Sequence, residues 1–211
     1  MLLKLEKMAG HNLTEKIPNE AVDIQEVEKV KNTASVLHAS RFSWRNIIVL
    51  IYLHISSLYG LYLAFTAAKW ETLVYVFALY VIGRFGVTAG IHRYWSHRSY
   101  KANSALRALL MFCCVLSFEG KVFIWARDHR VHHKYQETEA DPHNIRKGFW
   151  YAHVGWLLQK KNPIVVEKGK GINISDLTND KLLMFQNKHF WPLAILICFI
   201  PPTFIPMYFW G

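Results

Sequence analysis

Three apolar runs, each long enough to cross a lipid bilayer, dominate this chain of 211 residues. Residues 47–66 carry no charge, residues 73–91 carry only Arg84, and residues 190–210 are interrupted only by four prolines. A helix rises 1.5 Å per residue, so about 20 residues cover a hydrocarbon core of roughly 30 Å. The composition agrees, because 52% of the residues are hydrophobic and 15% are aromatic. We therefore predict an all-α integral membrane protein that spans the bilayer at these three runs.

The spacing of the runs predicts a helical hairpin followed by a third span. Only six residues, 67–72, join the first two runs, so these are expected to form a tight antiparallel hairpin whose outer ends emerge on one side of the membrane. A fourth apolar stretch, residues 105–118, has 14 residues and contains Arg107. This length suits a buried or surface-lying helix better than a span.

Basic residues are distributed unevenly around these runs. Seven Lys and Arg lie in residues 1–45 and sixteen in residues 92–189, against one, Lys69, in the connection between the first two runs. By the positive-inside rule, residues 1–45 are a cytosolic tail and residues 92–189 a cytosolic helical cap on a membrane domain at 46–211. The net charge of +10 then reflects topology and affinity for anionic groups such as lipid headgroups. It does not indicate binding to nucleic acid.

Two histidine clusters mark the start of the predicted cap. His129, His132 and His133 have the i, i+3, i+4 spacing that places three rings on one helical face. His92 and His97 are five residues apart, which is too far around for one face of an α-helix and predicts a helix end or bend where the second span leaves the bilayer. Five neutral imidazoles directed at one place predict a metal site. Imidazole suits zinc, copper, iron and nickel alike, but a site this rich in histidine favours two metals and therefore iron.

Other residue types add few constraints. Cys113, Cys114 and Cys198 all lie within apolar stretches, and an odd number of buried thiols argues against a disulfide framework. Residues 1–40 are polar and mixed in charge, without the apolar segment of a cleavable signal peptide. Two further histidines of the cap are left open between a supporting and a purely structural role, namely His143 and His153.

The stretches around the histidines resemble the membrane-bound acyl-CoA desaturases of the stearoyl-CoA (Δ9-type) family, particularly its insect members. The similarity extends from about residue 42 to residue 211 and is far more specific than the histidine spacing alone. It rests on TAGIHRYWSHRSYKA at 88–102, WARDHRVHHKY at 125–135, ETEADPHN at 137–144, GFWYAHVGWLL at 148–158, SDL at 175–177 and LMFQ at 183–186.

The resemblance implies an enzyme of the endoplasmic reticulum membrane whose N-terminus and histidines face the cytosol. Such enzymes take a saturated fatty acyl-CoA, O₂ and two electrons delivered by cytochrome b5 and its reductase. They introduce a C=C bond, here Δ9- or Δ11-like, by means of a histidine-bound di-iron centre. No side chain can attack the unactivated C–H bonds that are broken, so a cofactor must supply the chemistry.

The resemblance also implies roles for individual residues. The metal ligands of the family correspond to His92, His97, His129, His132 and His133. Its contacts to the CoA head group correspond to Arg127 and Asp128, with Lys160 and Lys161 near the CoA phosphates. Trp125 corresponds to an aromatic wall of the acyl tunnel and Tyr80 to a residue near its closed end. Taken without the resemblance, the two aromatic residues fit simple packing equally well, and the two lysines fit contacts to lipid headgroups.

The chain departs from the family pattern at several points. The family has a third histidine box, an asparagine near the iron and a fourth span, and none of these occurs within the 211 residues. We therefore expect a partial or truncated desaturase. A catalytically inactive desaturase-like membrane protein is the alternative, and a related hydroxylase is a weaker one. Arg84 stands where the family has a small residue, and Gly120 stands where the family commonly has an asparagine that helps to hold CoA. Both changes affect the expected acyl length and regiochemistry more than the expected reaction class.

Overall fold

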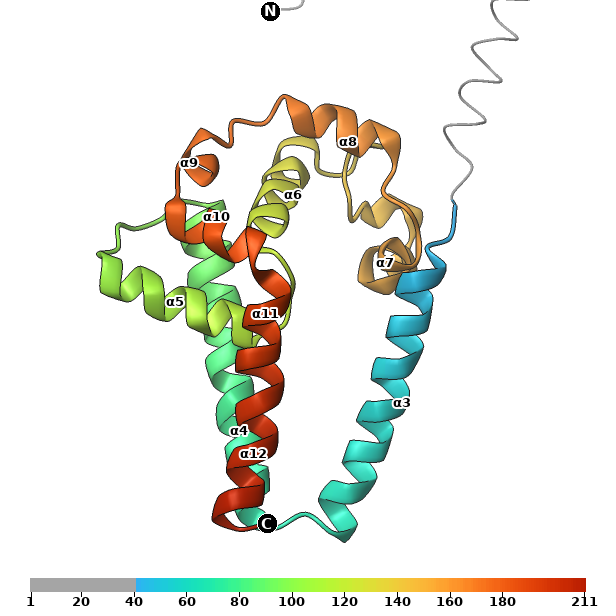
Figure 1. Ribbon diagram of the computed structural model, residues 1–211. Coiled ribbons are helices and arrows are strands. Elements are labelled where there is room, and N and C mark those ends of the chain that lie inside the picture. The colour runs from blue at the N-terminus through green and yellow to red at the C-terminus, as the bar shows by residue number, and fades with distance from the viewer. Residues whose placement is uncertain (1–40) are drawn as a thin grey trace, which may run out of the picture. The chain divides into compact units, whose positions relative to one another are not determined.

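The computed structural model describes residues 41–211, and within them the chain consists of helices joined by turns and loops (Figure 1). The only extended pairing among these residues is an isolated bridge between Phe42 and Gln159. The predicted all-α class is thereby confirmed. Residues 1–40, most of the predicted N-terminal tail, lie outside the described part of the chain.

Three helices are long and apolar enough to span a membrane, and they coincide with the three predicted runs. The first is α3 (Trp44–Thr66). The second, Trp70–Ser96, consists of α4 (Trp70–Phe85) continued by the π-helix η1 (Gly86–Ser96). The third, Phe190–Phe209, consists of α11 (Phe190–Ala194), a π-helical segment η4 (Ile195–Phe199) and α12 (Ile200–Phe209). Their length and composition make this an integral membrane protein.

The expected tight hairpin between the first two spans is wrong in one respect. A short turn joins α3 to α4, but the two helices diverge from that turn (Figure 1). No residue of α3 is buried, and its outer end is attached to α7 (Trp156–Leu158) instead. There the Asn46 side chain donates to Leu157 O at 2.8 Å. An apolar helix gains little by leaving lipid for an equally apolar neighbour, so a short connection alone does not force the two helices to pack.

The second span packs instead against α5 (Ser104–Leu116), which is the expected short apolar helix. The contact depends on glycines. A Cβ added at Gly86 would lie 2.3 Å from the backbone carbon of Cys113, and one added at Gly90 would lie 2.6 Å from Cys114 Sγ. The absence of side chains here lets the two helix backbones approach closely.

The third span changes its winding just before a pair of prolines. Pro201 and Pro202 have no backbone N–H and cannot complete the hydrogen-bond ladder with the preceding turn. The π-helical segment η4 ends at Phe199, shortly before them, and accommodates this interruption. At the far end, the Trp210 indole donates to Thr72 Oγ1 at 2.7 Å and meets the Tyr75 ring edge-on. These contacts attach the third span to the start of α4.

Between the second and third spans the chain forms a series of shorter helices (Figure 1). Seven core residues join this region to the second span, and each is at most 2% exposed: Ile91, Trp95, Leu110, Val122, Ala126, Leu177 and Leu183. The helices after α5 are α6 (Val122–Tyr135), η2 (Ile145–Lys147), η3 (Tyr151–Gly155), α7, α8 (Pro163–Lys170), α9 (Ser175–Thr178) and α10 (Lys181–Lys188).

A buried glutamine fixes the start of the helix that bears most of the histidines. Gln186 of α10 is fully buried. Its Oε1 accepts the Val122 N–H at 3.2 Å, and its Nε2 donates to Gly120 O at 3.1 Å. Because the first N–H groups of a helix have no partner within it, this side chain satisfies one of them and holds the N-terminus of α6 against the core.

Candidate metal centre

His92 and His97 come together because the second span ends in a π-helix. Its backbone hydrogen bonds join residues five apart, as in the bond from the His97 N–H to His92 O at 3.0 Å. Residues five apart therefore stay on one side of the helix, and the two ring centroids lie 4.5 Å apart. The predicted helix end is confirmed, since His97 caps η1. The wider π winding, and not a bend, explains the five-residue spacing.

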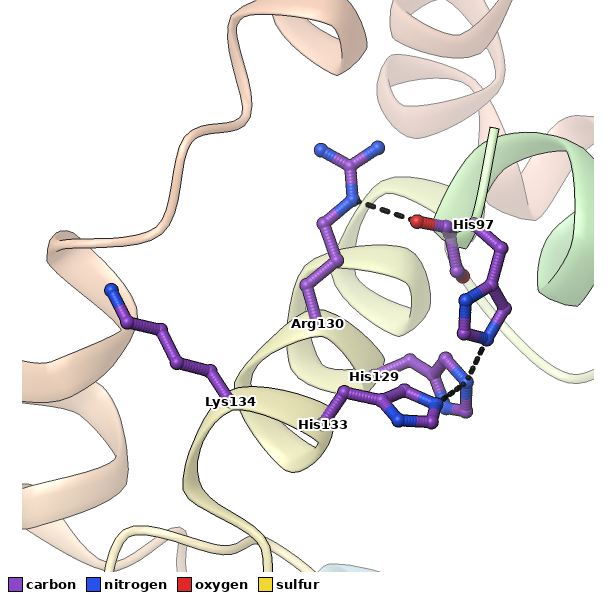
Figure 2. Close-up of a pocket in the computed structure, with 6 residues that line it drawn as sticks. His97, His129, Arg130, His133 and Lys134 are labelled. Atoms are coloured by element: carbon purple, nitrogen blue, oxygen red, sulfur yellow. Dashed lines mark hydrogen bonds between the residues drawn. The ribbon is translucent and has the colours of Figure 1, made fainter. Parts of the chain in front are cut away.

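α6 directs two of its histidines toward this pair (Figure 2). His129 Nε2 lies 3.1 Å from His97 Nε2 and 3.0 Å from His133 Nε2. His97 Nε2 in turn lies 3.2 Å from His92 Nε2. One ring nitrogen of each histidine lies within 4.8 Å of those of the other three. The two helices thus bring together four of the five predicted ligands, and we call these four residues the histidine cluster.

Burial and mutual repulsion lower the pKa values of three histidines of the cluster, His97, His129 and His133. Burial, followed by repulsion from the neighbouring rings of His133 and His92, lowers the pKa of His129 to about 3. The pKa values of His97 and His133 are also lowered, with burial again the larger cause. Rings with lowered pKa values are unprotonated near neutral pH, so their nitrogens keep the lone pairs that a metal requires.

The fifth predicted ligand, His132, faces a buried carboxylate. Its Nδ1 lies 2.8 Å from Asp141 Oδ1. Burial raises the pKa of Asp141, but hydrogen bonds from His132 and from the backbone N–H groups of Glu137 and His143 outweigh burial and lower that pKa. Since an ionised carboxylate only accepts hydrogen bonds, Nδ1 of His132 donates to it. His132 lies beside the histidine cluster, with its ring centroid 6.0 Å from that of His129.

Aromatic side chains lie against the rings of the histidine cluster and of His132. Trp125 stacks on His129, with centroids 4.8 Å apart, and meets His92 edge-on. The His143 ring lies 5.5 Å from that of His132 and 4.2 Å from that of Trp156. Trp125 is therefore in contact with the candidate site. His143, whose role the sequence leaves open, is a neighbour of His132.

Three of the four residues that the resemblance assigns to CoA lie together. Arg127 Nη2 donates to Asp128 Oδ1 at 2.9 Å, and Lys161 pairs with the other oxygen of the same carboxylate. The fourth, Lys160, is adjacent in the chain, and its backbone N–H donates to Arg41 O at 2.8 Å. Tyr80 lies elsewhere, on α4. It is 60% exposed, and the Arg84 guanidinium lies 5.9 Å from its ring centre.

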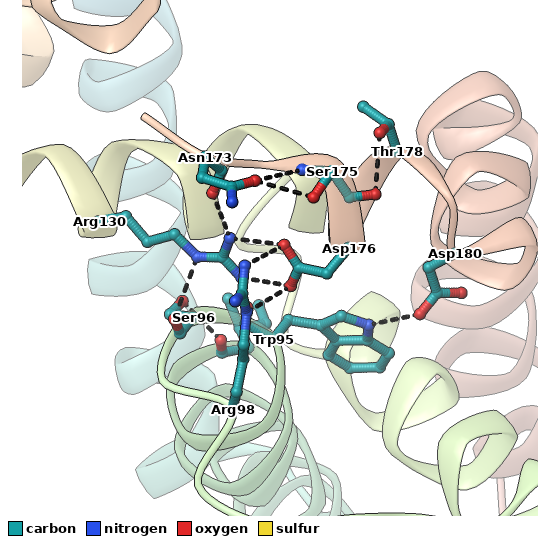
Figure 3. A network of polar contacts seen from close by, with 10 residues as sticks. Trp95, Ser96, Arg98, Arg130, Asn173, Ser175, Asp176, Thr178 and Asp180 are labelled. Atoms are coloured by element: carbon teal, nitrogen blue, oxygen red, sulfur yellow. Dashed lines mark hydrogen bonds and ion pairs between the residues drawn. The ribbon is translucent and has the colours of Figure 1, made fainter. Parts of the chain in front are cut away.

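The sequence does not predict a network of charged side chains that lies next to the histidine cluster. Arg98 directly follows His97 and Arg130 directly follows His129. Asp176 of α9 forms ion pairs with both arginines (Figure 3). The SDL stretch that contains Asp176 belongs to the resemblance, but nothing in the sequence assigns its carboxylate a partner.

The donor set of the histidine cluster fits a first-row transition metal. Nitrogens bound to one tetrahedral ion at roughly 2.1 Å lie about 3.4 Å apart, and the closest ring nitrogens here lie 3.0 to 3.2 Å apart. Beside them opens a cavity of about 320 Å³, lined by Ser96, His97, His129, Arg130, His133 and Lys134 (Figure 2). Imidazole nitrogens suit iron as well as zinc, copper and nickel.

The fold and the site together define a class, that of helical membrane proteins with a histidine cluster where one span ends. This chain belongs to the fatty acid desaturase family, which residues 68–211 match. The family predicted from the sequence is therefore confirmed.

Individual relatives agree with this assignment. The chain is 54% identical over 168 residues to the acyl-CoA Delta-9 desaturase of Acheta domesticus, and these residues cover 80% of this chain and 47% of that protein. It is 53% identical over 166 residues to the acyl-CoA Delta(11) desaturase of Spodoptera littoralis, with 79% and 49% covered. It is 51% identical over 170 residues to the stearoyl-CoA desaturase of Mesocricetus auratus, with 81% and 48% covered. The chain spans about half the length of these curated relatives.

Proposed function

We propose that this protein carries out the oxygen-dependent desaturation of a saturated fatty acyl-CoA. The observation that carries the proposal is the convergence of four histidine rings from η1 and α6, in a chain about half identical to proteins named acyl-CoA Delta-9 and Delta-11 desaturases. In this reaction a CH₂–CH₂ pair loses two hydrogens and becomes CH=CH. O₂ takes up those hydrogens with two electrons and two protons, and both oxygen atoms leave as water.

The proposed cofactor is iron, as a di-iron centre. His92, His97, His129 and His133 would hold one ion, and His132 would contribute to the second. Iron supplies, when bound, the activation of O₂ that no side chain can provide.

Other residues around the proposed metal centre orient its ligands and shield it from water. Asp141 accepts the Nδ1–H of His132, which fixes the tautomer of that ring and the direction of its free nitrogen. Trp125 covers one face of His129 and keeps water from it. Trp125 and Tyr80 are also the residues proposed to line the path of the acyl chain.

The CoA head group is proposed to lie near the paired charges of α6 and the segment after α7. Arg127 and Lys161 share the single carboxylate of Asp128, and Lys160 adds a further positive charge. This group of four residues carries an excess of positive charge, which suits phosphate groups.

We further propose that the protein lies in the endoplasmic reticulum membrane, with the N-terminal tail (1–45) and the cap (92–189) in the cytosol. The uneven distribution of Lys and Arg supports this orientation. In that orientation the histidine cluster faces the compartment of the proposed electron donors, cytochrome b5 and its reductase.

Expression in a yeast that lacks its own desaturase tests the proposal. The protein, tagged so that its amount in membranes is measured, is expected to support growth without added unsaturated fatty acid and to yield Δ9 or Δ11 alkenes by gas chromatography. His129→Ala is expected to abolish both. The matched control is His153→Ala, which removes a histidine whose ring stacks on Phe149 outside the histidine cluster and is expected to retain both.

Each other outcome has a distinct meaning. Alcohol in place of alkene would assign the chain to hydroxylation. A protein that inserts into membranes at normal levels and yields neither product would contradict the proposal and favour an inactive desaturase-like protein.

A further inference from the structure

We propose that Asp176 is a positioning residue. In each of the two histidine-bearing segments an arginine lies next to a histidine, and Asp176 holds both arginines and so sets the separation of the segments. This inference deepens the proposed function and rests on it, because it concerns the same histidine cluster. Figure 2 shows the Arg130 side chain pointing away from the rings of His129 and His133, and Figure 3 shows what it reaches.

The Asp176 carboxylate accepts two hydrogen bonds from each of two arginines. Arg130 donates from Nη1 to Oδ1 at 2.8 Å and from Nη2 to Oδ2 at 2.7 Å. Arg98 donates from Nε to Oδ2 at 2.8 Å and from Nη2 to Oδ1. Paired N–H groups that meet both oxygens are the most directional form of a charged hydrogen bond. One side chain of α9 therefore joins the end of η1 to α6.

Arg130 also binds the backbone of the second span directly. Its Nη2 donates to Trp95 O at 2.6 Å and its Nε donates to Ser96 O at 3.1 Å. His97 follows Ser96, and His129 precedes Arg130. A single guanidinium thus connects the backbone beside one proposed ligand to the backbone beside another, and the ring nitrogens of these two histidines lie 3.1 Å apart.

The arginines require a counter-charge in order to stay where they are. The Arg130 side chain is only 11% exposed, and it shares Asp176 with a second guanidinium. Without the carboxylate, two like charges would face each other and one of them would be buried unpaired, which is strongly unfavourable. Burial raises the pKa of Asp176, but the hydrogen bonds from Arg130 and Arg98 outweigh burial and lower that pKa to about 2. The carboxylate is therefore charged at physiological pH.

The backbone next to His97 supplies independent support. Arg98 has a φ of 53°, a conformation that residues other than glycine rarely adopt. Such a conformation persists only where surrounding contacts hold it. The paired hydrogen bonds from Arg98 to Asp176 are contacts of this kind, and they hold the turn that immediately follows His97.

The loop before α9 presents its acceptors in a fixed geometry. Asn173 O accepts from Arg130 Nη1 at 2.9 Å. The Asn173 side chain accepts the Ser175 N–H at 3.1 Å and the Ser175 hydroxyl at 2.8 Å. These local bonds shape the loop, so Asp176 and Asn173 O reach Arg130 together.

Asp180 provides a matched control within the same stretch of chain. It accepts from the Trp95 indole at 3.1 Å and from Arg107 Nη2 at 2.5 Å, and it caps α10 by accepting the Leu183 N–H. Asp180 therefore anchors the same stretch of chain, at the start of α10, with an ion pair of its own. Its arginine, however, is not adjacent to a histidine of the cluster.

Cobalt(II) binding to the 211-residue chain in detergent micelles separates positioning from general stability. The ion is titrated into metal-free protein and followed by its visible absorption, and thermal unfolding of the metal-free protein is measured in parallel. Asp176→Asn is expected to weaken cobalt binding about tenfold and to change the shape of the absorption band, as loss of a ligand-orienting contact does. Asp180→Asn is expected to lower the unfolding temperature comparably but to bind cobalt as the unaltered chain does.

Two milder variants keep the test decisive if Asp176→Asn folds poorly. Asp176→Glu keeps the charge and is expected to recover most of the affinity. Arg98→Lys keeps the positive charge but loses the paired donors, and it is expected to weaken binding by a smaller factor than Asp176→Asn. Unchanged cobalt affinity and spectrum in all three variants would overturn the positioning role.

Equal losses in the Asp176 and Asp180 variants would also overturn it, since the effect would then be one of stability. If the unaltered chain itself binds no cobalt, the metal site of the proposed function fails and the positioning role fails with it. That outcome is seen before any variant is compared, so the two failures are distinguishable.

Discussion

The first and second spans are both apolar enough to cross a membrane, but only the second is built into the rest of the protein. α3 has no buried residue and meets its neighbours mainly at its outer end. The second span packs its glycines against α5, pairs Arg84 with Glu119 and ends in two histidines of the cluster. The difference teaches that apolar length specifies insertion, whereas small residues and polar ends specify packing and chemistry.

Each of these two spans also contains a histidine, and the two histidines behave differently. The ring of His54 in α3 is bonded to Leu50 O of its own helix, at 2.7 Å from Nδ1. His92 in η1 faces the rings of His97 and His129. The residue type is the same, but only one of the two has partners from other elements.

The largest expected effect comes from filling the glycine contact. Gly86→Leu would place a side chain where the Cys113 backbone lies, and overpacking of this kind costs about 3 kcal/mol or more. The variant is expected to be poorly folded by size-exclusion chromatography and thermal unfolding in detergent. Gly60→Leu, at a site of α3 with no atom near the added Cβ, is expected to fold normally. Equal tolerance of both variants would contradict the difference between the spans.

The next largest effect concerns the two histidines. His92→Ala is expected to lower cobalt affinity by roughly 100-fold, since removing a ligand costs at least as much as removing its supporting contacts. His54→Ala is expected to leave cobalt binding unchanged. Titration of both variants in detergent measures this, and a similar loss in the α3 variant would show that the ring of His54 takes part in the site.

A smaller effect is expected at the charged pair of the second span. Arg84 Nη2 lies 2.8 Å from Glu119 Oε1, so the charge that departs from the family pattern in the second span is paired with a residue of the loop before α6. Glu119→Gln leaves the arginine unpaired in an apolar span and is expected to cost about 1 kcal/mol, because both side chains are partly exposed. Exchange of the two residues, Arg84→Glu with Glu119→Arg, is expected to restore part of the unfolding temperature. Failure of the exchange to exceed the single variants would show that the pair does not contribute.

The last prediction concerns a pH dependence at Asp176. Its pKa in the folded protein, about 2, lies below the ordinary value of roughly 3.9. Its contribution to stability is therefore fully present above about pH 4 and is lost as the pH falls through about 2. The difference in unfolding temperature between the unaltered chain and Asp176→Asn is expected to shrink over this window. A difference that grows toward low pH would contradict the assigned pairing.

Much of the fold follows from local patterns. Uncharged length identifies the spans, and the short run at residues 105–118 is too short to be one, so α5 is foreseeable. The divergence of α3 from α4 is not foreseeable, because a short connection limits where a helix starts but not what it packs against. The π winding of η1 is also not predictable from the sequence, since this segment has no proline that would indicate it.

The sequence by itself determined that this chain is a helical membrane protein of the desaturase family and which histidines carry its candidate site, because apolar length and histidine spacing are properties of neighbouring residues. Only the tertiary structure decided that His92, His97, His129 and His133 converge while His132 turns to Asp141, and that Asp176 holds the arginines beside them. Most of these contacts join residues that are far apart in the chain. They depend on the winding of η1 and on the packing of α6 and α9 around it, which no local pattern encodes.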